Sequence, residues 1–143
     1  MNKKLSLIGN IGIAAFFLLF PVTGLLWIWN DAHSKIKSSA TQYVQSTFPE
    51  LTKSLITNQE SEDISVAFKD SIAKNPHKFV EVNKLTKITP VNSYTKQEGE
   101  RMAQYVKLQI QGQTANGSAN YDITIRRLTI APRWRYTEVT LQP

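Results

Sequence analysis

Four arginines, Arg126, Arg127, Arg133 and Arg135, surround Trp134 and Tyr136 near the end of the chain. Arginine binds phosphate and carboxylate groups bidentately, and aromatic rings offer surfaces for stacking. If a hairpin brings these residues together, they form a docking site for an acidic partner or an anionic head group. The alternative is that the arginines form the solvated face of a sheet while Trp134 belongs to the core.

The other residues that could do chemistry lack the spacing of a catalytic or metal site. His33 and His77 are far apart and have no ligand pattern around them, and the chain has no cysteine. Nucleophile-elbow, glycine-rich phosphate-loop and zinc-protease motifs are also missing. The sequence therefore predicts a protein that is not an enzyme and needs no metal or cofactor.

The acidic residues have ordinary structural explanations. Glu60, Glu62 and Asp63 fall where a helix is expected to start, and negative charge stabilises that end of a helix. Glu98 and Glu100 lie in a polar segment that we interpret as an exposed loop.

The length of the chain allows one small domain, and its net charge does not indicate a binding partner. The 143 residues carry a formal charge of +6. Without Lys3 and Lys4, 15 basic residues face 11 acidic ones, an excess too small to imply binding to anionic lipid or to nucleic acid.

Residues 5–29 contain no charged side chain, and as a helix they would extend roughly 37 Å. This length predicts an uncleaved transmembrane helix. Lys3 and Lys4 would mark its cytoplasmic side, and Trp27 and Trp29 would lie at the outer interface. The predicted organisation is a cytoplasmic tail (1–4), the transmembrane helix (5–29) and an extracytoplasmic α+β domain (30–143), in a single-pass protein of the bacterial inner membrane with a periplasmic domain.

Two helices are expected to open that domain. Apolar residues recur at steps of three and four through 31–57, with a kink or restart at Pro49. A second helix is expected over 61–74, capped by Ser61 and ended by Asn75-Pro76.

Alternating apolar residues in the second half predict strands. Residues 105–111 and 119–125 flank Asn116-Gly117, a dipeptide typical of a two-residue hairpin turn. That turn would place Ile110 opposite Ile123 and Val106 opposite Arg127, so a β-bulge is expected near Arg126-Arg127. A final strand carries Trp134 and Tyr136 and then, after a change of phase, Val139 and Leu141. A first strand within 85–95 should lie at an edge because it contains Pro90.

The expected fold is therefore α+β: one transmembrane helix, then two helices packed on a curved antiparallel sheet of about four strands. This order, with the closing residues 121–127, Trp134-Arg135-Tyr136 and Val139-Thr140-Leu141, resembles small membrane-anchored envelope proteins with an NTF2-like or cystatin-like domain. It also resembles oxidase assembly factors and VirB8-like secretion components.

The resemblance implies a non-enzymatic accessory or assembly subunit of an envelope complex, with the lipid bilayer and an envelope protein as partners. Two alternatives remain open. One is a module that binds a small ligand or an anionic lipid between sheet and helix. The other is a small enzyme that uses the same pocket.

Overall fold

The computed structural model describes residues 2–57, 59, 61–65, 68–69 and 79–143, with side chains from Pro21 onward except that of Pro132. The chain divides into two units, Met1–Lys35 and Ile36–Pro143. The described elements are one helix, α1 (Asn2–Ile56), and four strands: β1 (Lys84–Glu98), β2 (Arg101–Thr114), β3 (Gly117–Leu128) and β4 (Ala131–Leu141).

The helical part of the predicted fold is wrong. Residues 5–29 belong to α1, which continues without a break through the charged residues Asp31, Lys35 and Lys37. Within the described residues, no helix has a stretch long and apolar enough to cross a membrane. The uncharged residues 5–29 are not a separate helix, because α1 continues well into polar sequence.

Of the kink or restart expected at Pro49, the restart is absent, since α1 runs on without a break to Ile56. Proline costs an interior helix about 3 kcal/mol because it removes one hydrogen bond and crowds the preceding turn. Its neighbours Phe48 and Leu51 are almost fully buried. Burying side chains of this size contributes roughly 1.5–3 kcal/mol each, enough to offset the proline.

The second predicted helix, 61–74, falls largely outside the described residues. Its described beginning is not helical, because Ile64 forms a parallel bridge with Tyr136 of β4. The backbone N–H of Ser65 donates to the Tyr136 carbonyl at 2.9 Å, and that of Tyr136 donates to the Asp63 carbonyl at 2.7 Å. Ser61 is therefore not the helical cap, and residues 61–65 cover part of the β4 edge. Further along the predicted range, the described residues Phe68 and Lys69 are helical, and the Phe68 N–H donates to Ser65 Oγ at 3.2 Å.

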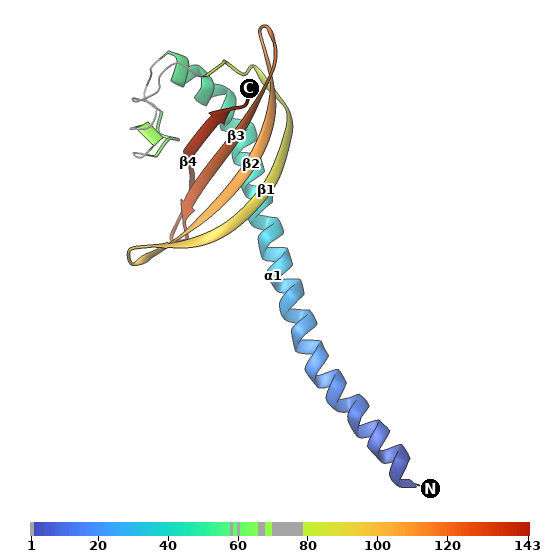
Figure 1. Cartoon of the computed structure of the whole chain (residues 1–143). Helices are drawn as coiled ribbons and strands as arrows, with labels where there is room; N and C mark the ends of the chain where they lie inside the picture. Colours follow the sequence, from blue (N-terminus) through green and yellow to red (C-terminus); the bar gives the residue numbers. More distant parts are fainter. Residues whose placement is uncertain (1, 58, 60, 66–67, 70–78) are drawn as a thin grey trace. The chain divides into compact units, whose positions relative to one another are not determined.

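The four strands form one antiparallel sheet, as the sequence predicted, and the structure gives their order as β1-β2-β3-β4 (Figure 1). The part of α1 from Ile36 to Ile56 lies against one face, which we call the helix-facing face. Pro90 lies in the edge strand β1, also as predicted, next to a register shift between Pro90 and Asn92. A bulge and a proline both discourage pairing of an exposed edge with another chain.

The predicted hairpin is present, but its register is two residues off. Thr114 pairs with Gly117, so the loop is Ala115-Asn116, and Ile110 lies opposite Tyr121. A two-residue slip keeps every side chain on its face, so the alternating pattern could not distinguish the two registers. Val106 opposes Ile125, and the β2–β3 pairing has no bulge. The irregularities lie instead between β3 and β4, at Thr124/Ile125 and Arg126/Leu128.

The core joins a stripe of α1 to alternate residues of the sheet. The helix contributes Ala40, Val44, Phe48 and Leu51, at the spacing of one helical face. The strands contribute residues that alternate along each strand, among them Val106, Leu108, Ile110, Tyr121, Ile123, Ile125, Trp134, Tyr136 and Val139.

Segment 79–83 closes one end of this core. Val82 N–H donates to Thr52 Oγ1 at 3.1 Å, and Val80 exchanges two 2.8 Å hydrogen bonds with the Tyr121 hydroxyl. Val82 also packs on Gly112, where an added Cβ would lie 2.3 Å from a Val82 methyl carbon. Gly112 is therefore required for this close approach.

We predict that Gly112→Ala destabilises the domain by about 1–3 kcal/mol, because the added methyl group must displace Val82. Urea unfolding of the full chain measures this change. Gly24→Ala is the matched control, since nothing lies within 4 Å of the corresponding Cβ. Equal stability of Gly112→Ala and the wild type would show that segment 79–83 does not pack as described.

Candidate binding surfaces

The structure separates the six residues of the predicted docking patch. Arg126 and Arg135 pair across β3 and β4 on the outer face, the face away from the helix. Trp134 and Tyr136 point to the helix-facing side, with exposed fractions of 3% and 0%. Buried side chains cannot contact a partner, so the patch does not form as one surface.

Arg126 is held by Glu98, at the end of β1. Its Nε donates to Glu98 Oε1 at 3.1 Å, its Nη2 donates to Oε2, and the Tyr105 hydroxyl donates to Oε1. The pKa of Glu98 is lowered, first by the hydrogen bond from Arg126 and then by that from Tyr105. Glu98 thus links β1, β2 and β3 and is not a solvated loop residue.

Arg127 and Trp134 are partners of each other. The guanidinium carbon lies 4.6 Å from the Trp134 ring centroid, and Arg127 Nε donates to Gln104 Oε1 at 2.8 Å. Trp134 Nε1 donates to Ser39 Oγ at 3.2 Å, joining β4 to the helix. Trp134 therefore belongs to the core, as the alternative interpretation expected.

Arg133 is paired with the segment that covers the β4 edge. Its Nη1 lies 3.1 Å from Glu62 Oε2 and its Nη2 3.5 Å from Asp63 Oδ1. Asp63 also accepts a 2.9 Å hydrogen bond from the Tyr43 hydroxyl. Burial, and then this contact with Asp63, raise the pKa of Tyr43 far above its ordinary value of 10.0. Glu62 and Asp63 are thus explained by ion pairing with Arg133, not by a helix start.

The outer face of the sheet has no cover among the described elements and is polar. Two adjoining hollows lie on it, of about 350 Å³ and 270 Å³. Both are lined by Gln109, Asp122 and Gln142. The wider lining consists mainly of amide, hydroxyl and charged side chains from all four strands: Lys87, Thr89, Gln111, Asn120, Lys107, Thr124, Glu138 and Thr140.

The carboxylates of these hollows are held by neutral donors. Gln142 Nε2 donates to Asp122 Oδ2, and Thr124 Oγ1 donates to Glu138 Oε2 at 3.0 Å. Neither Lys87 nor Lys107 has an ion pair within the described part of the chain. The outer face therefore presents charges of both signs beside a row of amides, and this combination suits binding to a polar protein surface.

The remaining predicted positions are distributed as follows. Trp27 and Trp29 of α1 are largely exposed, at 72% and 61%, and Trp29 contacts the His33 ring at 4.1 Å between centroids. The side chains of Lys3 and Lys4, as well as Glu60 and His77, lie outside the described residues. Among the residues that are described, no group of three or more potential ligands could hold a metal ion.

Comparison with known proteins gives no relative: no protein-family model, curated protein or solved structure matches the chain significantly. The resemblance to NTF2-like, cystatin-like and VirB8-like proteins stays a prediction.

Sequence analysis missed Glu98 as a structural residue and the outer face as a surface. The polar residues that alternate with apolar ones in each strand, such as Lys107, Gln109 and Gln111, could have indicated this face. Because successive side chains of a strand point to opposite faces, these polar residues mark the face that no described element covers.

We predict that Glu98→Gln lowers the free energy of unfolding at pH 7 by about 1 kcal/mol, since it weakens a partly exposed ion pair. Because folding lowers the pKa of Glu98, its contribution is complete above the ordinary value of 4.5 and is lost as pH falls through the folded value. Thermal unfolding between pH 7 and pH 3 measures it. The stability difference between wild type and variant should shrink on acidification, and a constant difference would contradict the assignment.

Proposed function

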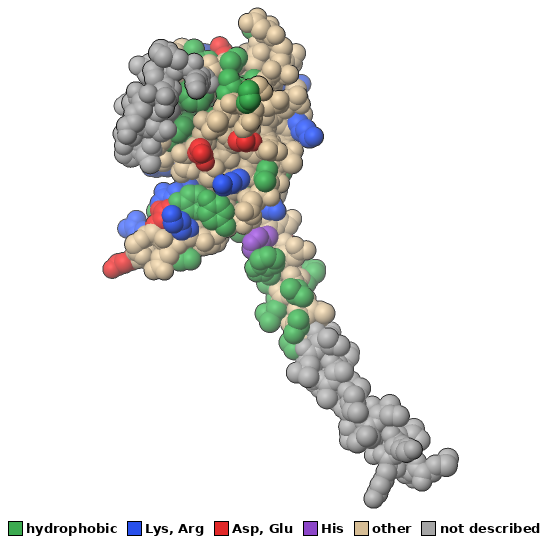
Figure 2. All heavy atoms as spheres, in the orientation of Figure 1, with side chains coloured by type: hydrophobic (Ala, Val, Ile, Leu, Met, Phe, Trp, Pro, Cys, Tyr) green, Lys and Arg blue, Asp and Glu red, His purple; other side chains and the backbone are tan. Residues whose placement is uncertain are grey.

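We propose that this chain is a non-enzymatic accessory subunit that binds another envelope protein through the outer face of its sheet. The observation that carries the proposal is a polar sheet face that no described element covers, whereas α1 packs on the other face. Figure 2 shows charged side chains of both signs spread over the globular part.

The chemistry of this face supports binding more than catalysis. Asp122 and Glu138 accept hydrogen bonds from neutral side chains, and no histidine lines either hollow. General acid–base catalysis needs a group positioned to exchange a proton with a substrate. Amides and hydroxyls in rows instead match the polar groups found on the rims of protein interfaces.

The size of the face also suits a protein partner. Its polar residues run across all four strands, and the two hollows are open and adjoin one another. A small ligand would be expected in an enclosed, mostly apolar pocket. A wide face with two partly open hollows better fits side chains that project from another folded protein.

Photo-crosslinking in intact cells tests the proposal. We expect a photoreactive residue at Gln109 or Thr140, both exposed on the outer face, to capture the same defined protein. The matched control is the same residue at Lys53, an exposed position on α1. Tyr136 is not a suitable position, because its side chain is buried.

Capture of one protein from both outer-face positions and not from Lys53 would support docking through this face. Capture of the same proteins from all three positions, or of none from the outer face, would contradict it.

A further inference from the structure

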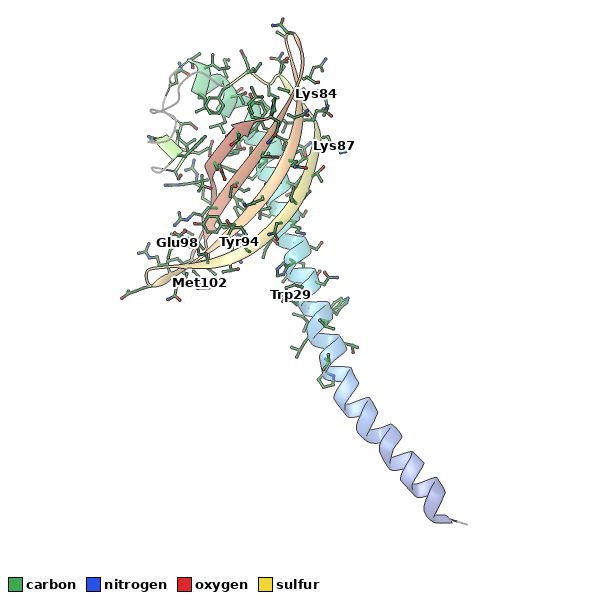
Figure 3. The ribbon with its side chains drawn as sticks, in the orientation of Figure 1. Trp29, Lys84, Lys87, Tyr94, Glu98 and Met102 are labelled. Atoms are coloured by element: carbon green, nitrogen blue, oxygen red, sulfur yellow. The ribbon has the colours of Figure 1, made fainter. Side chains whose placement is uncertain are left out.

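One end of the sheet brings two turns together. These are the β1–β2 turn at Gly99-Glu100 and the β3–β4 turn at Thr129-Ile130. Thr129 N–H and Oγ1 both donate to the Met102 carbonyl, at 3.0 and 2.8 Å. We call this region, residues 96–102 and 126–135, the turn end. Figure 3 shows Glu98 and Met102 there.

The turn end exposes two large apolar side chains. Ile130 is 75% exposed and Met102 46% exposed, and the hydrogen bonds from the Thr129 N–H and hydroxyl to the Met102 carbonyl hold the two turns side by side. Single exposed apolar residues are common on protein surfaces. A pair fixed on neighbouring turns, among basic residues, is a more specific feature.

The charges that remain free at the turn end are mostly positive. The ion pair of Arg126 with Glu98 is neutral, whereas Arg133 is paired with two carboxylates, Glu62 and Asp63, which leave one negative charge beside the turn end. Among the described residues, four basic side chains of the turn end have no ion pair, against one acidic side chain, Glu100. The four are Lys96, Arg101, Arg127 and Arg135.

We propose that the turn end contacts an anionic lipid surface. Ile130 and Met102 would enter the head-group boundary while the exposed guanidinium groups of Arg101 and Arg135 bind lipid phosphates. Apolar side chains flanked by basic ones are the combination by which proteins bind such surfaces. Neither of the two hollows described on the outer face includes a residue of the turn end.

The sequence before the domain gives a second reason to choose lipid. Val22, Leu25, Leu26, Trp27, Ile28 and Trp29 are all more than half exposed on α1. A helix that is apolar all round requires an apolar environment. Only six residues separate Trp29 from Ile36, and even a fully extended chain would span no more than about 25 Å there. A lipid surface that holds Trp29 is therefore within reach of the domain.

Contact between the turn end and lipid can be measured with a fluorophore on one introduced cysteine, because the chain has no cysteine of its own. Full-length Ile130→Cys carrying an environment-sensitive fluorophore is reconstituted with phosphatidylcholine vesicles, with or without phosphatidylglycerol. We expect quenching by lipid-borne nitroxides on the anionic vesicles only. Asn116→Cys, in the turn at the opposite end of the sheet, is the control and should stay unquenched on both.

Charge variants test the basic residues directly. Each basic residue near an anionic surface contributes roughly a fivefold factor. The double variant Arg101→Gln/Arg135→Gln should therefore lower the ratio of lipid-bound to water-exposed label at Ile130→Cys by about 25-fold. Lys87→Gln/Lys107→Gln removes the same charge from the outer face and should leave the label unchanged.

A label that stays unquenched on anionic vesicles, or is quenched equally on neutral ones, would overturn the proposal. Equal effects of the two charge variants would do the same. These readouts do not depend on docking by the outer face, so either proposal can fail alone.

Discussion

The domain depends on the burial of one stripe of α1 against one face of the sheet. Ala40, Val44, Phe48 and Leu51 are at most 1% exposed, and they share one core cluster with alternate residues of β2, β3 and β4, against which Leu85 and Ile88 of β1 also pack. With only one helix in the described part of this unit, only one face of the sheet receives such a cover. The uncovered face must be stable in water, and this requirement explains its polar side chains. The same constraint leaves that face free to bind a partner.

The polar groups around the core serve mainly to join elements. Thr52, Tyr121 and Trp134 each have a buried polar group that bonds another part of the chain. Buried polar groups without such bonds would cost about 1–3 kcal/mol each. Glu98 has a similar role on the outer side, where one carboxylate links three strands through Arg126 and Tyr105. Much of the chemistry suggested by the arginine-rich end of the sequence is therefore structural.

The sequence predicted the antiparallel strands, the edge position of Pro90 and the change of phase in the last strand, because alternation reports directly on burial. It could not fix the β2–β3 register, since two registers place the same residues on the same faces. It also could not show that the buried Phe48 and Leu51 would keep α1 continuous through Pro49, because that depends on tertiary packing. Nor could spacing reveal that Arg126 and Arg127 point to opposite faces beside different partners, Glu98 and Trp134.

The central claim is that the outer face is covered by a partner where the protein works. Lysine acylation measures this most directly, by comparing native membrane preparations with the purified full chain. Lys87 and Lys107 lie on the outer face, whereas Lys53 lies on the exposed side of α1. The account predicts that Lys87 and Lys107 are protected in the native preparation and reactive after purification, while Lys53 reacts equally in both. Equal reactivity of all three lysines in both preparations would contradict it.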